Sequence, residues 1–146
     1  SADNWVLRGC PHTGPAMAAN SFGLHLVWFT MGGGQGVYYT HSTDDGSTYS
    51  QRDTVSTTPM AKHPQITTVG DDKLMIVWDE PVKAGKEMNS RVGYQLRKGN
   101  GEVLKTGLLT ADSLYVTFPV LKAVDEKTVL VAYTKKGNVC YRWVNI

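Results

Sequence analysis

The stretch Ser42-Thr43-Asp44-Asp45-Gly46-Ser47-Thr48-Tyr49 decides the fold, because it specifies a tight turn through short polar side chains and one glycine. Asp44 can accept hydrogen bonds from backbone N–H groups of the turn, and the hydroxyls of Ser42 and Thr48 can bond the nearby backbone. Gly46 can adopt the positive φ angle that such a turn requires. The stretch therefore predicts a turn between two strands.

A three-part unit recurs three times along the chain. Each unit begins at a proline two residues before a large apolar side chain, at Pro15, Pro64 and Pro119. The prolines are 49 and 55 residues apart (64 − 15 and 119 − 64), a period typical of propeller blades. Each unit then continues through a turn into an apolar run and a third strand. The apolar runs are 24–28, 74–78 and 129–133, and the third strands are 37–40, 92–95 and 139–142.

The residue pattern predicts an all-β fold. Alternating polarity, β-branched and aromatic side chains and frequent Gly or Asp turn signals favour strands, and no sustained helical stripe is present. The apolar runs are typical of strands buried on both faces. Trp28, Trp78 and Tyr133 close these runs and are expected to be core aromatics; a sugar-stacking platform is the alternative.

Outer strands set the expected domain organisation. A fourth strand follows the first two units, over residues 51–56 and 102–110, whereas the third unit has no residues left for one. Residues 4–8 form an outer strand without a blade of its own, so we expect them to complete a third blade. The chain is then a single domain, 1–146, with blades over about 14–56, 63–110 and 118–146.

Composition narrows the function classes. The 146 residues, 41% hydrophobic and 19% charged, suit one globular domain. A net charge of +2 without a basic run argues against nucleic-acid binding, and no apolar run approaches the roughly 20 residues of a membrane span. Residues 1–4 resemble neither a signal peptide nor a transit sequence, and they identify no compartment. Cys10 and Cys140 are either two reduced residues or a disulfide.

The first two units resemble the carboxy-terminal half of bacterial sialidase-like proteins, the BNR-repeat family. The turn at 42–49 is similar to their Asp-box, Ser-x-Asp-x-Gly-x-Thr-aromatic, with Tyr49 at the aromatic position. Further matching stretches are 9–15, 27–30, 36–39, 63–65 and 77–80. The resemblance implies a sialidase-like β-propeller whose Asp-box lies on the face opposite the ligand site. Tyr49 is then expected to pack into its blade.

Such relatives resemble full six-bladed chains, so this chain resembles one half of a propeller. Propellers typically have four to eight blades, and an open stack of three would expose apolar faces that soluble monomers avoid. We therefore expect a homodimer that closes a six-bladed ring, in which each chain donates its first strand to the third blade of the other.

The candidate ligand face consists of the loops that enter each first strand and the loops that join each second strand to the third. These loops cover 8–14, 57–63, 111–118, 30–35, 79–91 and 134–138. The expected ligand-binding residues share charge or an imidazole and are Arg8, His12, His63, Asp79, Glu80 and Arg91. The two histidines could form a metal or anion site, or they could simply bind loop carbonyls; neither has metal-ligand spacing to a second ligand.

The sequence favours binding over catalysis. Active members of the resembled family use three arginines on the sugar carboxylate, a Tyr and Glu pair, and an Asp acid. Here only Arg8 and Arg91 could face the channel. We therefore expect a module that binds a glycan, another small anionic ligand or a protein partner, without cofactor or metal. The alternatives are an exo-acting glycoside hydrolase with Asp79 or Glu80 as acid, and a purely structural propeller.

Overall fold

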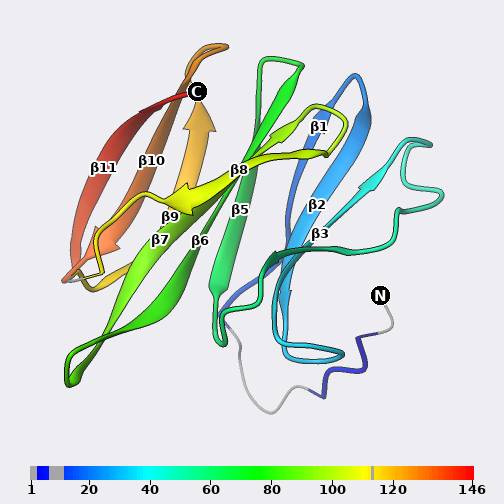
Figure 1. Ribbon diagram of the computed structural model, residues 1–146. Helices are drawn as coiled ribbons and strands as arrows, with labels where there is room; N and C mark the ends of the chain where they lie inside the picture. Colours follow the sequence, from blue (N-terminus) through cyan, green and yellow to red (C-terminus); the bar gives the residue numbers. More distant parts are fainter. Residues whose placement is uncertain (1–2, 7–11, 113) are drawn as a thin grey trace.

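The computed structural model describes residues 3–6, 12–112 and 114–146, which form eleven strands in three antiparallel sheets (Figure 1). The first sheet contains β1 (Ala16–Asn20), β2 (Gly23–Thr30), β3 (Gly36–Ser42) and β4 (Asp53–Ser56). The second contains β5 (Lys62–Val69), β6 (Lys73–Ala84), β7 (Glu87–Lys98) and β8 (Val103–Leu108). The third contains β9 (Val116–Ala123), β10 (Thr128–Lys135) and β11 (Asn138–Asn145). The described residues include no helix, so the all-β prediction is confirmed.

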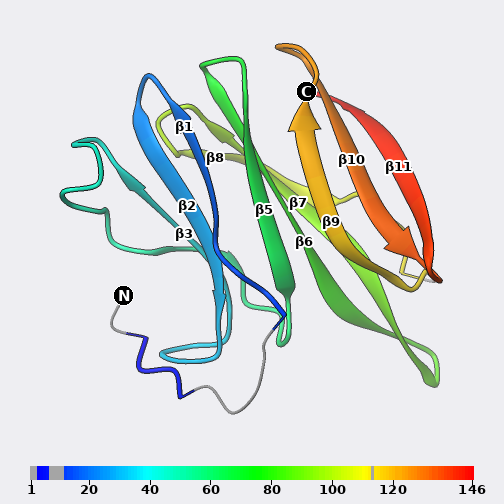
Figure 2. The same cartoon turned by 180° about the vertical axis from the view of Figure 1, so that it is seen from behind.

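Each sheet is a meander in which neighbours in sequence pair with one another. The three apolar runs lie in the second strands β2, β6 and β10, as their continuous hydrophobicity predicts. The first strands β1, β5 and β9 lie side by side in the view of Figure 2 and contact one another in that order. The sheets therefore stack face to face along the chain.

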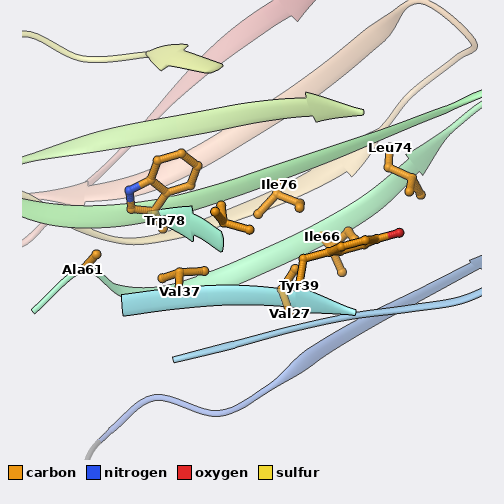
Figure 3. Close-up of a cluster of buried hydrophobic side chains, with 9 residues drawn as sticks. Val27, Val37, Tyr39, Ala61, Ile66, Leu74, Ile76 and Trp78 are labelled. Carbon is orange, nitrogen blue, oxygen red and sulfur yellow. The ribbon is translucent and has the colours of Figure 1, made fainter. Parts of the chain in front are cut away.

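Two apolar clusters hold this stack together. The first lies between the first and second sheets and includes Val27, Tyr39, Ile66, Ile76 and Trp78 (Figure 3). The second lies between the second and third sheets and includes Met75, Val77, Val129, Val131 and Tyr133. Because side chains alternate along a strand, β6 supplies even-numbered residues to the first cluster and odd-numbered residues to the second.

The described amino-terminal residues 3–6 pair with no strand in the single chain. The Asp3 carboxylate accepts hydrogen bonds from Trp28 Nε1 at 2.9 Å and Arg52 at 2.5 Å. Trp5 packs edge-on against Phe29, with ring centroids 5.5 Å apart. These contacts hold residues 3–6 against the first sheet, where they form no strand. Residues 7 and 8 lie outside the described part, and strand donation to another chain stays a prediction.

The turn at 42–49 joins β3 to β4 through its own hydrogen bonds. Asp44 Oδ1 accepts from Ser42 Oγ at 2.7 Å and from the Thr48 backbone at 2.8 Å, while Asp44 Oδ2 accepts from the Thr48 hydroxyl at 2.7 Å. These hydrogen bonds lower the pKa of Asp44 to about 2, with the Thr48 hydroxyl as the largest cause. Gly46 adopts a φ of 88°, as expected.

The expected packing of Tyr49 into its sheet is wrong. Its side chain is 48% exposed, and its hydroxyl lies close above Gly46, where an added Cβ would approach it to 3.1 Å. The ring thus covers the turn because the glycine leaves room for it. Elsewhere, Cys140 is half-buried and forms no disulfide with a described residue, while Cys10 lies outside the described part. The described chain also contains no helix long and apolar enough to span a membrane.

Candidate functional site

A cavity of about 560 Å³ opens between the second and third sheets. Its walls come from four segments of the expected ligand face, namely 60–63, 79–90, 115–118 and 134–137. These segments lie at the same ends of β5, β6, β7, β9 and β10, so the stacking of the sheets brings them together. The cavity is the place where sequence-distant polar side chains meet.

His63 and Asp79 form the centre of this site. His63 Nδ1 lies 2.7 Å from Asp79 Oδ2, and both side chains are largely buried. The backbone N–H of Phe118 donates to the same carboxylate oxygen at 2.7 Å. Asp79 therefore links the starts of β5 and β9 to the middle of β6, and its carboxylate requires a proton on His63 Nδ1. No described residue pairs with His63 Nε2, which is accessible and can serve as a hydrogen-bond acceptor.

His63 and Phe118 occupy equivalent backbone positions in their sheets. Each directly precedes a proline, and each has a positive φ, 49° and 55° respectively. Residues before proline usually adopt extended conformations, so this geometry is strained and needs support. Asp79 binds the backbone N–H of Phe118, and the Thr13 hydroxyl accepts from that of His63 at 3.1 Å. The two rings consequently meet at the cavity, with centroids 4.2 Å apart.

The rim of the cavity combines aromatic, thioether and cationic side chains. Tyr115 and Phe118 are 54% and 52% exposed, although both are large and apolar. Met60 and Met88 are exposed as well, and Lys62 and Lys136 supply two ammonium groups. Aromatic rings beside cationic groups suit a ligand that has both an apolar face and an anionic group.

Sequence reasoning missed part of this rim. Tyr115, Phe118, Lys62 and Lys136 were not among the expected ligand residues, although they fall within loops assigned to that face. The repeat offered one usable signal, because Phe118 precedes Pro119 as His63 precedes Pro64. Because the units align at these prolines, Phe118 and His63 occupy equivalent positions in the repeat.

Glu80 of β6 and Arg91 of β7 lie on the other face of the second sheet, toward the first sheet. Glu80 Oε1 accepts from Arg91 Nε at 2.8 Å, and Glu80 Oε2 accepts from Trp78 Nε1 at 2.7 Å. Arg91 also donates to Asp112 at 2.9 Å; this hydrogen bond is the largest cause that raises the Arg91 pKa. The Glu80 carboxylate is thus buried and ion-paired with Arg91, beside a smaller cavity of about 420 Å³.

The two expected ligand residues Asp79 and Glu80 therefore border different cavities. Consecutive residues of a strand point to opposite faces, so the two carboxylates enter different inter-sheet spaces. His12 is exposed, and Arg8 lies outside the described residues. Within the described segments, no group of three His, Cys, Asp or Glu residues could hold a metal ion.

Comparison of the chain with protein-family models, with curated proteins and with solved structures found no match.

Proposed function

We propose that the chain is a sialidase-like β-propeller binding module that recognises an acidic glycan or another small anionic ligand. In this proposal each sheet is one blade, and the adjacent first strands β1, β5 and β9 line the centre. The observation that carries the proposal is the cavity between the second and third sheets. It combines two lysines, an oriented histidine and two exposed aromatic rings.

Each wall of the cavity suits a different part of such a ligand. The ammonium groups of Lys62 and Lys136 attract a carboxylate or another anionic group. The exposed rings of Tyr115 and Phe118 offer surfaces for the apolar face of a sugar ring. His63 Nε2 accepts a hydrogen bond from a ligand hydroxyl, because Asp79 holds the proton on Nδ1.

The geometry favours binding over glycoside hydrolysis. Glycosidases of the usual kind place two carboxyl groups on either side of one glycosidic bond. Asp79 and Glu80 lie on opposite faces of β6 and so cannot flank one bond. Asp79 Oδ2 already accepts two N–H groups, and Glu80 is bound by Arg91 and Trp78. Neither carboxylate is thus placed to protonate a leaving group.

A glycan array that pairs carboxylated sugars with their neutral counterparts tests the proposal. We expect saturable binding to the carboxylated members alone, and calorimetry should show at least a tenfold loss of affinity for Lys62→Ala and Lys136→Ala. Lys105→Ala is the matched control, since Lys105 is exposed on β8, away from the cavity. Equal affinity of all three variants would contradict the assignment of the site.

A fluorogenic sialoside separates the binding module from the hydrolase. We expect no turnover by the unaltered chain under conditions where it binds carboxylated glycans. Turnover that disappears in Asp79→Ala would instead favour the exo-acting glycosidase.

A further inference from the structure

The two outer faces of the stack lie on the first sheet and on the third, and no other sheet covers them among the described residues; Asp3 contacts the first at Trp28. We call the face of a sheet that points toward the next sheet in the chain its forward face, and the opposite face its backward face. Each contact between two sheets of the chain joins a forward face to a backward face. The forward faces of the first two sheets include Val27 and Val77, and the backward faces of the last two include Trp78 and Tyr133. The same pairing of faces therefore occurs twice within one chain.

The forward face of the third sheet has no cover among the described residues. Its side chains alternate along β11, where Val139, Tyr141 and Trp143 are 80%, 65% and 57% exposed. In the strand register, Tyr141 lies opposite Ala132 of β10, which in turn lies opposite Val120 of β9. Val120 is 53% exposed, so the apolar surface crosses all three strands. Exposed apolar patches of this extent usually mark an interaction surface.

The backward face of the first sheet is its counterpart. Leu24, Leu26 and Trp28 occupy the positions on β2 that Leu74, Ile76 and Trp78 occupy on β6. Met17 of β1 lies opposite Leu26 and is 63% exposed. This face thus has the residue types and strand positions that pack against a forward face inside the chain.

We propose that the forward face of the third sheet packs on the backward face of the first sheet of a second copy of this chain. The contact continues the two inter-sheet interfaces already present, with the same order of faces. It is head to tail, so each copy uses two different surfaces. The inference rests on the proposed blades, but it does not depend on the proposed ligand.

The number of copies follows from the size of known propellers. Copies that contribute three blades each give rings of three, six or nine blades. Propellers typically have four to eight blades, so only the six-bladed ring of two copies falls in this range. Both contacts in that dimer are equivalent, and no apolar outer face remains open.

Solution mass by size-exclusion chromatography with light scattering tests the inference. We expect about twice the 16.0 kDa chain mass at micromolar concentration. Tyr141→Lys and Met17→Lys should each return the mass to that of one chain. The first substitution puts a charge on the forward face of the third sheet, and the second puts one on the backward face of the first sheet. Leu104→Lys is the control, since Leu104 is 44% exposed on the outer β8 strand of the second sheet. Circular dichroism establishes that all variants remain folded.

Mixing the variants distinguishes a head-to-tail contact from one between identical faces. A mixture of Tyr141→Lys and Met17→Lys chains should recover part of the dimer, because one of its two contacts then contains neither substitution. Dimers that survive Met17→Lys but not Tyr141→Lys would indicate third sheets packed on each other and would overturn the proposal. A monomer of the unaltered chain would overturn it as well. Glycan binding by that monomer would leave the proposed function intact, since one chain supplies the whole cavity.

Discussion

The two spaces between the sheets bury polar groups in different ways. Between the first and second sheets, Arg97 is 1% exposed and lies 4.1 Å above the Tyr39 ring. Its Nε donates to Gln95 at 2.7 Å, and its NH1 donates to Asp53 at 2.8 Å and to Gly101 O at 2.9 Å. Between the second and third sheets, the buried His63 and Asp79 pair instead borders a cavity.

The polar groups of the first space serve stability, whereas those of the second are placed to bind a ligand. In the first space, the protein itself supplies partners for Nε and NH1 of Arg97, and only NH2 has none within the described residues. In the second space, one nitrogen of His63 is held by Asp79 and the other is left to the cavity. Substitutions in the first space should therefore change the free energy of unfolding, whereas those at the cavity rim should change ligand affinity.

Arg97→Ala should have the largest effect on stability. It removes a buried side chain that fills the space above Tyr39 and satisfies the carbonyl of Gly101, so we expect a loss of about 4 kcal/mol in the free energy of unfolding. Urea denaturation at neutral pH measures this change. The neighbouring Lys98→Ala, at a half-exposed ammonium, should change stability by less than about 0.5 kcal/mol. A comparable loss in both variants would contradict the role of Arg97.

Acid should lower the free energy of unfolding through His25, which is fully buried beside Tyr39 in the first space. Burial, followed by the charges of His41 and Arg97, lowers the His25 pKa from 6.5 to about 4. Between these values the unfolded chain binds more protons, so the free energy of unfolding is highest above pH 6.5 and falls toward pH 4. The fall should reach up to about 3 kcal/mol.

Urea titrations of the unaltered chain and of His25→Gln, at a series of pH values, measure this contribution. The amide that replaces the imidazole in this variant cannot titrate, so the variant should lose much less stability between pH 6.5 and pH 4. His12→Gln, at an exposed position, is the control and should follow the unaltered chain. Parallel profiles for all three proteins would exclude His25 as the cause.

Asp79→Asn should affect both properties to an intermediate degree. The amide keeps one acceptor oxygen but loses the charge that strengthens the bonds to His63 and the Phe118 backbone, so we expect a stability loss of about 1.5 kcal/mol. Because His63 is then held less firmly, affinity for a carboxylated glycan should fall at least tenfold. Asp72→Asn, in an exposed turn, is the control for both measurements. Unchanged affinity would show that Asp79 serves stability alone.

Tyr115→Ala should have the smallest effect on stability and the clearest effect on binding. The side chain is 54% exposed, so its removal should change the free energy of unfolding by less than about 0.5 kcal/mol. It also removes an aromatic surface at the cavity, which should cost severalfold in affinity for the glycan. Calorimetry on folded protein checks this, with Tyr49→Ala as a similarly exposed aromatic control. An equal affinity loss in the control would contradict a specific role for Tyr115.

Local signals in the sequence predicted the strands and the polar turn, because their causes lie within a few residues. The apolar runs mark β2, β6 and β10, and Asp44 bonds within its own turn. The hydrogen-bonded pair of His63 and Asp79 was not predicted as such, although both residues were expected in the site. Their meeting depends on the bulged pairing of β5 with β6, which residue patterns do not specify.

Side-chain contacts between residues of different sheets could not be predicted from the sequence. Arg97 is not one of the two arginines expected at the channel, yet it is buried, with Tyr39 of the first sheet beneath it. Phe118 was assigned to a loop of the ligand face without a role of its own, yet its ring lies at the cavity beside His63. Both cases depend on how sheets stack, and the stacking brings together residues that are far apart in the chain.

The meander order of the strands also shapes how the chain acquires its structure during synthesis. Every strand pairs with a neighbour in sequence, so each sheet can form from local contacts as soon as its own residues are available. The apolar forward face of each completed sheet then stays exposed until the next sheet has been synthesised and covers it. Nascent chains are consequently most prone to aggregate just after each sheet is finished, and a pause in translation there would prolong that exposure.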